Sequence, residues 1–245
     1  MKIISIVNHK GGVGKTTTTL NLGKALTLID KKVLIVDIDP QANLSQSIGV
    51  ENPSTNIYHA LCEDQVPPIL SIGDHIDLIP SDIDLSEAEL KLQNEVNGYF
   101  RLKKMLADID ATYDYILIDC PPSLSVLTLN ALIASTLTMI IVQVEYLATK
   151  GLKTILSLIE EIKENLNPEL EVLGLLLTQL DRTIIRNQIA QQVKSVYSGK
   201  VFDTAIRSNV SLTEASAMNQ DIFTYNPKTA GAEDYLNLAK EVSNE

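Results

Sequence analysis

Short apolar runs, many of them β-branched, alternate along the chain with longer segments in which apolar residues recur every three or four positions. The runs are typical of parallel strands that are covered on both faces, and the longer segments are typical of amphipathic helices. Strands are therefore predicted at residues 3–7, 33–36, 76–79, 115–118, 139–144 and 172–177, with a short edge segment at 201–206. Helices are predicted at residues 16–29, 56–61, 86–96, 99–109, 125–134, 149–166, 184–197 and 230–242.

This regular alternation predicts one α/β domain over residues 1–245, with a mostly parallel, twisted sheet, right-handed crossovers and helices on both faces. Apart from the short helix at 56–61, residues 42–75 are predicted to be irregular, because Pro53, Pro67 and Pro68 interrupt them. Ser86 and Glu89 have the spacing of a capping box at the start of the helix at 86–96. The histidines at 59 and 75 have no partners at metal-ligand spacing and are expected at the surface or in packing.

A glycine-rich loop joins the first strand to the first helix and contains Lys10, Gly11, Gly12, Val13, Gly14, Lys15, Thr16 and Thr17. Such a loop directs backbone N–H groups and a helix N-terminus at one point, where phosphate can bind. In the P-loop pattern, Lys15 would reach the β- and γ-phosphates and the Thr16 hydroxyl would bind Mg²⁺. His9 occupies the position where the standard pattern has glycine, and Lys10 is an additional lysine. The loop predicts a P-loop NTPase fold that binds a nucleoside triphosphate; the alternative is a glycine-rich turn that only caps a helix.

Carboxylates follow two of the predicted strands. Asp37 and Asp39 come after the strand at 33–36, and Asp119 ends the strand at 115–118. Ligands of open α/β sheets bind at the carboxyl ends of the strands, so Asp39 is a candidate for binding Mg²⁺ or positioning water, and Asp119 for the Walker B role at the metal. The alternatives are turn formation before Pro40 and an acidic strand end before a Pro-Pro turn.

Composition narrows the class of protein. Apolar residues make up 45% of the 245 residues, which favours a globular core over disorder. The two cysteines lack metal or redox spacing and are expected to be free thiols, and Cys120 is expected in packing. A strand that begins within three residues leaves no room for a signal peptide, and the apolar runs are too short to span a membrane. The net charge of −11 excludes a protein that is basic all over, but a local basic patch remains compatible with it.

Several motifs together resemble the ParA family of partition ATPases within the ParA/MinD group. They are the loop at 10–17, the stretches at 36–43 and 118–122, and the late segments at 209–215, 225–227 and 231–232, so the resemblance covers nearly the whole chain. It implies a homodimer that forms with ATP and Mg²⁺, in which Lys10 reaches the phosphates of the partner subunit. It also implies that Lys15 and Thr17 contact phosphates, that Asp39 orients the attacking water and that Asp119 holds Mg²⁺ through a water molecule.

The resemblance further implies slow ATP hydrolysis that is stimulated by a ParB-type centromere-binding protein. The ATP dimer would bind double-stranded DNA without sequence preference, in a cytoplasmic, nucleoid-associated protein. Where relatives often have Pro-Arg-Asn-Val-Arg, this chain has Arg207-Ser208-Asn209-Val210-Ser211. Residues 182–207 nevertheless contain one acid and five basic residues, namely Arg182, Arg186, Lys194, Lys200 and Arg207. They are candidates for DNA contact, with a solvated helix face as the alternative, and Arg207 is also a candidate for contact with the adenine ring.

Related functions remain as alternatives. A MinD-like regulator recruited to a membrane would need a basic amphipathic C-terminal helix, whereas this C-terminus is acidic, so no membrane partner is expected. An iron–sulfur protein would need suitably placed cysteines, and the related tyrosine kinases have a tyrosine-rich tail. A ParA-like ATPase that positions a protein cargo cannot be separated from DNA partition by sequence. No N-terminal extension for a helix-turn-helix precedes the loop, so site-specific repression is not expected.

Overall fold

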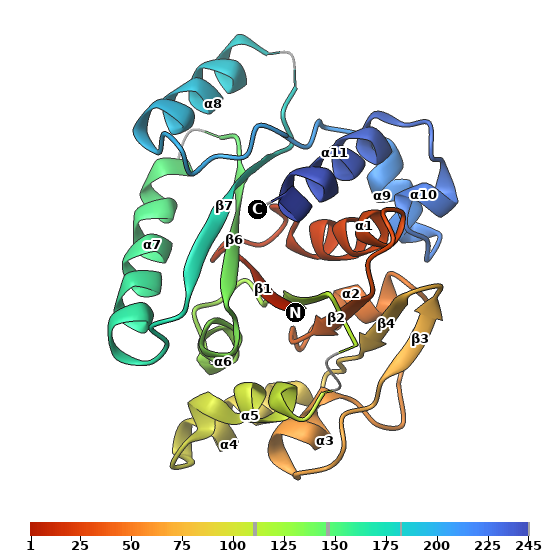
Figure 1. Cartoon of the computed structure of the whole chain (residues 1–245), viewed down its shortest axis with the longest axis vertical. Coiled ribbons are helices and arrows are strands. Elements are labelled where there is room, and N and C mark those ends of the chain that lie inside the picture. The colour runs from red at the N-terminus through yellow and green to blue at the C-terminus, as the bar shows by residue number, and fades with distance from the viewer. Residues whose placement is uncertain (110–111, 146–147, 182, 245) are drawn as a thin grey trace.

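A seven-stranded sheet forms the centre of the molecule, with strand order β3-β4-β2-β5-β1-β6-β7 (Figure 1). The structure is a computed structural model that describes residues 1–109, 112–145, 148–181 and 183–244. Six strands run parallel: β1 (Lys2–Val7), β2 (Val33–Asp37), β4 (Ile76–Ile79), β5 (Tyr115–Asp119), β6 (Leu137–Gln143) and β7 (Glu171–Thr178). The edge strand β3 (Leu70–Gly73) is antiparallel to β4. The predicted α/β fold with a mostly parallel sheet is confirmed.

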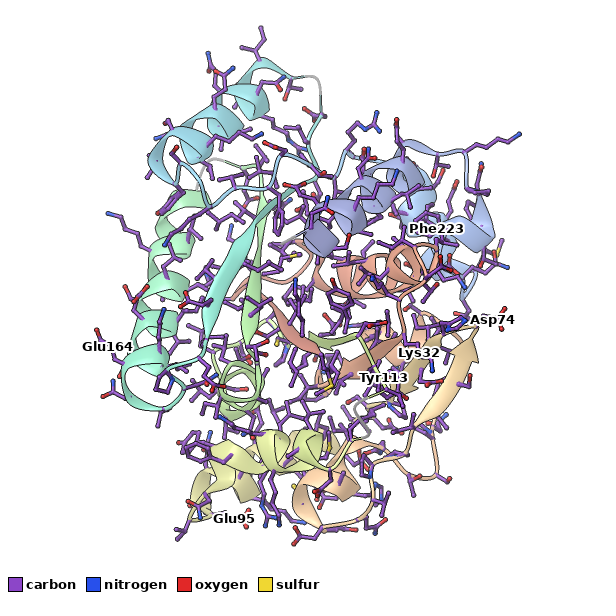
Figure 2. The ribbon with its side chains drawn as sticks, viewed as in Figure 1. Lys32, Asp74, Glu95, Tyr113, Glu164 and Phe223 are labelled. Atoms are coloured by element: carbon purple, nitrogen blue, oxygen red, sulfur yellow. The ribbon has the colours of Figure 1, made fainter. Side chains whose placement is uncertain are left out.

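Helices cover both faces of the sheet because successive strand residues point to opposite sides. Ile4, Ile6 and Ile35 pack on the side of α1 (Lys15–Thr27), α2 (Asn43–Gln46), α9 (Val210–Ala217), α10 (Ile222–Tyr225) and α11 (Ala230–Asn244). Leu34 and Val36 pack on the other side, which is covered by α3 (Ile57–Cys62), α4 (Leu85–Asn94), α5 (Arg101–Ala107), α6 (Val126–Ala134), α7 (Ala148–Asn165) and α8 (Ile184–Val196). Figure 2 shows the side chains that fill these layers, with the exposed Glu95 and Glu164 at the periphery.

The parallel strands bring the polar ends of β1, β2 and β5 to one edge of the sheet. Ile6 pairs with Asp119 across β1 and β5, and Asp37 pairs with Asp119 across β2 and β5. The glycine-rich loop that follows β1 therefore lies beside both acidic strand ends. This edge is where the predicted site residues meet.

The predicted capping box was wrong. Helix α4 begins at Leu85, and Asp84 precedes it without a side-chain cap. Asp84 instead accepts hydrogen bonds from the Asn56 side-chain amide at 2.9 and 3.0 Å. The observed capping box is at α3, where Asn56 Oδ1 accepts from the Tyr58 N–H at 2.8 Å and His59 Nδ1 accepts from the Asn56 N–H at 3.3 Å.

Other differences concern short elements. The region 42–75 contains α2 and β3 in addition to α3, and the predicted helix at 99–109 is a 3₁₀ turn (Gly98–Phe100) followed by α5. Helices α9 and α10 were not predicted. The edge segment at 201–206 is confirmed, because the Leu175 N–H donates to the Lys200 carbonyl and the Phe202 N–H donates to the Leu175 carbonyl. Within the described ranges, no helix is both long enough and apolar enough to cross a bilayer.

Candidate functional site

The glycine-rich loop adopts a backbone conformation that only glycine reaches without strain. Gly12 and Gly14 have φ angles of 71° and 99°, in the left-handed region. A Cβ atom added to Gly12 would meet nothing within 4 Å, so the backbone angle, and not crowding, requires glycine there. Gly14 caps α1 without a side-chain hydrogen bond to its first turn. Because glycine has no side chain that could accept their hydrogen bonds, the N–H groups of that turn can serve an anion.

Lys15 folds back over the loop. Its ammonium donates to the Lys10 carbonyl at 2.9 Å, and only 7% of the residue is exposed. Burial lowers the pKa of Lys15, and the nearby Asp119 opposes that shift. Lys15 lines a cleft of about 760 Å³ together with Gly11, Gly12, Gly14, Thr16, Thr17 and Asp39. The cleft thus combines a cation, hydroxyl groups and a carboxylate around the N-terminus of α1.

Asp119 joins the end of β5 to the start of α1. It is fully buried, and its carboxylate accepts hydrogen bonds from the Thr16 hydroxyl at 2.7 Å and the Thr19 hydroxyl at 3.3 Å. Burial, with Asp37 close by, raises the pKa of Asp119 to about 8. Hydroxyl and carboxylate oxygens are the ligands that Mg²⁺ prefers, and Mg²⁺ completes its shell with phosphate and water. The pair of Thr16 and Asp119 therefore fits this ion.

Asp37 and Asp39 have different surroundings. Asp37 is fully buried and accepts hydrogen bonds from the N–H and hydroxyl of Ser45 at 2.9 and 2.7 Å, and burial raises its pKa to about 6. Asp39 lines the cleft, and its Oδ1 accepts from the Gln41 N–H at 3.0 Å. Ser81 braces the same turn by donating to the Asp39 carbonyl at 2.8 Å. Asp37 thus supports the turn, while Asp39 faces the cleft.

Two residues that the sequence analysis missed hold the loop from β7. The Thr178 hydroxyl donates to the Val13 carbonyl, and the Gln179 side-chain amide donates to the Gly12 carbonyl, each at 2.8 Å. Their signal in the sequence is position alone: they stand at the carboxyl end of a predicted parallel strand, and such ends share one edge of the sheet. These hydrogen bonds hold the backbone of the loop at Gly12 and Val13.

The Lys10 side chain points away from the cleft-lining residues of the loop and contacts Glu145 instead. Its ammonium pairs with Glu145, just past β6, and the backbone N–H of Lys10 donates to Asn8 Oδ1 at 2.9 Å. Lys10 and Glu145 line a separate small cavity of about 20 Å³ at the junction of β6 and α7. The predicted site residues Lys15, Thr16, Thr17, Asp39 and Asp119 are thus brought together, whereas the Lys10 ammonium lies beside them.

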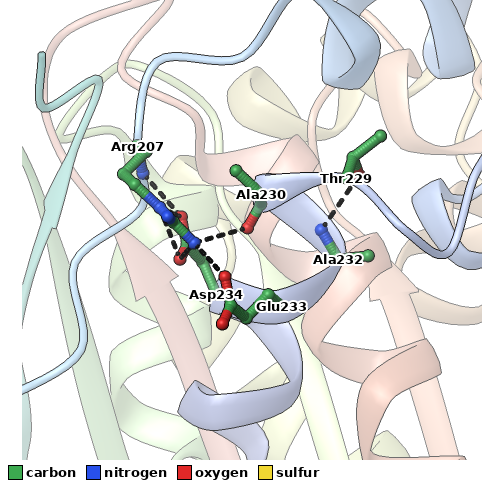
Figure 3. Close-up of polar contacts among 6 residues, drawn as sticks. All are labelled: Arg207, Thr229, Ala230, Ala232, Glu233 and Asp234. Carbon is green, nitrogen blue, oxygen red and sulfur yellow. Dashed lines mark hydrogen bonds and ion pairs between the residues drawn. The ribbon is translucent and has the colours of Figure 1, made fainter.

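Arg207 connects the segment after β7 to the C-terminal helix (Figure 3). Its guanidinium donates to Asp234 at 2.6–3.0 Å and to Glu233 at 2.6 Å, and its backbone N–H donates to Asp234 at 2.9 Å. These hydrogen bonds, those to Asp234 foremost, raise the pKa of Arg207. Arg207 also lines a cavity of about 310 Å³ with Gly14 and Thr17. Its predicted contact with adenine stays a prediction.

The candidate DNA residues are distributed unevenly. Arg186 donates to the Gln179 carbonyl and pairs with Asp181 at 3.3 Å, so it braces the start of α8. Lys194 is exposed in the last turn of α8, and Lys200 is exposed in the loop that follows. Arg182 lies outside the described residues. Lys194 and Lys200 are the candidates that remain open to solvent in this part of the chain.

Comparison with known proteins adds the family context. Residues 1–172 match a family described as an AAA domain. The chain is 45% identical over 248 residues to the sporulation initiation inhibitor protein Soj of Bacillus subtilis, in an alignment that covers 99% of this chain and 98% of that protein. It is 40% identical over 247 residues to the chromosome partitioning protein ParA of Myxococcus xanthus, in an alignment that covers 98% of this chain and 87% of that protein.

A solved structure from Mycobacterium smegmatis, described as cobyrinic acid a,c-diamide synthase with a bound ATP analogue and magnesium, is 33% identical. It superposes with a TM-score of 0.87 over 98% of this chain and 93% of that one.

Proposed function

The chain belongs to the ParA family of partition ATPases, and on that premise we propose that it is a dimeric switch that binds ATP with Mg²⁺ and hydrolyses it slowly. The observation that carries this proposal is the convergence of Lys15, Thr16 and Asp39 around one cleft at the carboxyl edge of the sheet, with the buried Asp119 hydrogen-bonded to Thr16. The similar structure described with an ATP analogue and magnesium supports the choice of ligand.

We assign to each residue the role that the resemblance to the ParA family implies. The N–H groups of the loop and of the first turn of α1 would bind the phosphates, with Lys15 at the β- and γ-phosphates and Thr17 at the α-phosphate. Thr16 would bind Mg²⁺ directly and Asp119 through a water molecule. Bound Mg²⁺ offsets the negative charge of the phosphate oxygens during phosphoryl transfer.

Asp39 and Lys10 would complete the catalytic machinery. Asp39 is 5% exposed and is fixed by its turn, so its carboxylate can orient a water molecule for attack without a large search of rotamers. Lys10 would reach the phosphates of the partner subunit, where a second cation stabilises charge that develops in the transition state.

The biological output we propose is partition of a plasmid or chromosome. A ParB-type protein would stimulate hydrolysis, and the ATP dimer would bind DNA without sequence preference through a surface that includes Lys194 and Lys200, which would place the protein on the nucleoid. No membrane role is included, because the apolar face of α11 (Tyr235, Leu238, Ala239 and Val242) is buried within the protein.

The first test is the mass of the protein in solution without nucleotide, with ADP, with ATP, and with ATP on an Asp39→Ala background. We expect a dimer only with ATP, and we expect the variant to bind ATP but to remain dimeric after the wild-type protein has returned to monomers. A monomer under every condition would refute the dimeric switch, and a wild-type rate of phosphate release from the variant would refute the role of Asp39.

A further inference from the structure

Residues 8–10, which precede the glycines of the loop, contact the junction between β6 and α7. The Asn8 side chain donates to the Ile141 carbonyl and accepts the N–H of Lys10, whose ammonium pairs with Glu145. His9 lies against Gly151 so closely that a Cβ atom at position 151 would stand 2.2 Å from its Cε1 atom. Three consecutive residues thus contact the same junction between two elements, and Lys10 has a defined resting position.

This resting position conflicts with the role proposed for Lys10. The pair is only partly exposed, with side-chain exposures of 38% for Lys10 and 37% for Glu145. An ammonium that moved to the phosphates of a partner subunit while still holding Glu145 would carry that carboxylate toward a highly negative group. The repulsion between them would offset the attraction that Lys10 supplies. Lys10 must therefore leave Glu145 before it can serve the partner's site.

We propose that Glu145 is a positioning residue that holds Lys10 within its own protomer and competes with the ATP-bound partner for it. This inference rests on the proposed function, because the competing state is the ATP dimer. A partly exposed ion pair shifts an equilibrium by roughly 1.5- to 5-fold. Two such pairs separate in each dimer, so the factor enters twice, and Glu145 weakens the ATP dimer by roughly 2- to 25-fold. The residue sets the ATP-dependent threshold for assembly without touching the nucleotide.

The resting contact can be tested on the monomer, independently of assembly. Glu145→Gln keeps the shape of the side chain and removes its charge, and Glu171→Gln makes the same change in a separate pair, Lys163 with Glu171. Acetylation of lysine amines by an N-hydroxysuccinimide ester is followed by mass spectrometry without nucleotide. We expect Lys10 to react roughly 1.5- to 5-fold faster in Glu145→Gln than in the wild type and at the wild-type rate in Glu171→Gln. Lys163 should react faster in Glu171→Gln and at the wild-type rate in Glu145→Gln. An unchanged rate at Lys10 would overturn the proposal.

The competition is tested by sedimentation of both variants and the wild-type protein over a range of ATP concentrations. We expect Glu145→Gln to dimerise at lower ATP, with a dimer dissociation constant roughly 2- to 25-fold below that of the wild type, and Glu171→Gln to match the wild type. Phosphate release per assembled dimer should stay unchanged, and the unfolding midpoint should fall no further in Glu145→Gln than in Glu171→Gln, since each variant loses one partly exposed ion pair. A merely structural role would not strengthen the dimer in one variant alone. A weaker dimer in Glu145→Gln would overturn the proposal, because it would mean that Glu145 supports the assembled state. If the wild-type protein itself never dimerised, the proposed function would fail while the labelling result would still stand.

Discussion

At the scale of single residues, the acids at the ends of β2 and β5 show how similar motifs acquire different chemistry. Asp37 and Asp119 are paired neighbours in adjacent strands and both are fully buried, whereas Asp39 lines the cleft. Burial disfavours the charged form of a carboxyl group, and a second buried carboxyl nearby adds to that effect. Burial therefore raises the pKa of both carboxyl groups, and more for Asp119 than for Asp37.

Asp119→Asn tests this balance through stability. The pKa of Asp119 in the folded protein, about 8, lies above its ordinary value of 3.8, so the folded state holds the proton more firmly than the unfolded state. Its contribution is therefore fully present at low pH and is lost as the pH rises from about 4 to about 8. The amide side chain of Asp119→Asn does not titrate. The free energy of unfolding of this variant, relative to that of the wild type, should therefore rise across this window by up to about 1.4 kcal/mol per pH unit.

The measurement is urea unfolding at pH 5, 6.5 and 8 without nucleotide or Mg²⁺. Asp74→Asn serves as a control for the loss of one carboxyl group, since Asp74 is exposed at the turn between β3 and β4. Parallel stability curves for Asp119→Asn and the wild type would contradict the expected linkage.

At the scale of elements, α1 connects the phosphate-binding loop to the C-terminal part of the chain. The Thr18 hydroxyl and the Tyr235 hydroxyl are 3.1 Å apart, and Asn21 Oδ1 accepts from the Ile222 N–H at 2.7 Å. Tyr235 belongs to α11, whose first turn also holds Arg207 beside the loop. The position of α1, and with it the loop, thus depends on helices that are far from it in the sequence.

Substitutions at the start of α11 should show how much a buried and an exposed carboxylate each contribute to the free energy of unfolding through their contacts with Arg207. Asp234 is 5% exposed and accepts several hydrogen bonds from Arg207. The Glu233 side chain, which forms a second ion pair with Arg207, is 66% exposed. Asp234→Asn should reduce the free energy of unfolding by about 2 kcal/mol, because it leaves Arg207 with weakened partners. Glu233→Gln should reduce it by less than about 0.5 kcal/mol.

Both variants remove one carboxylate from the same arginine, so they are matched in charge. Denaturant unfolding measured at several wavelengths gives the two free energies. Equal losses of stability in the two variants would show that burial does not set the strength of this contact.

At the scale of the whole molecule, charge is distributed unevenly. The chain has a net charge of −11, yet the 13 residues of α8 contain no acid. Lys194 is exposed in the last turn of this helix and Lys200 in the loop that follows it. Helix α8 lies on the opposite side of the molecule from α5 (Figure 1). A local basic surface can bind a polyanion in an acidic protein, because the interaction is screened within about 10 Å at moderate salt.

DNA retention by the ATP-bound protein should therefore depend on this surface. Lys194→Glu combined with Lys200→Glu should weaken binding to random duplex DNA by at least about tenfold at low salt. It should also reduce the slope of log affinity against log salt by about 0.9 for each phosphate that the protein no longer neutralises. The matched control is Lys103→Glu with Lys104→Glu on α5, where both residues are exposed.

Fluorescence anisotropy over a salt series gives both quantities. The control should keep the wild-type affinity and slope, apart from a small shared effect of net charge. Equal weakening in the two double variants would show that general charge, and not the surface at the end of α8, governs retention.

Local patterns along the chain were enough to predict many elements of the fold and the position of the site. Apolar runs and periodic segments marked six of the seven strands and most of the long helices, because burial on a parallel sheet demands them. The glycines of the loop and the acids after two strands indicated the site, since parallel strands place their carboxyl ends together. The short strand β3 was not predicted, because it forms by pairing with β4. The capping box predicted at Ser86 was wrong, because the residue that precedes the helix is Asp84.

The three-dimensional arrangement of the elements alone determines which side chains meet across them. It separated Asp37, closed off by Ser45, from Asp39 in the cleft, and it placed Thr178 and Gln179 on the carbonyls of the loop. It also paired Lys10 with Glu145, 135 residues away in the chain. Pairings of this kind depend on the order of the strands in the sheet, because that order decides which loops become neighbours, and residue spacing along the chain carries no record of it.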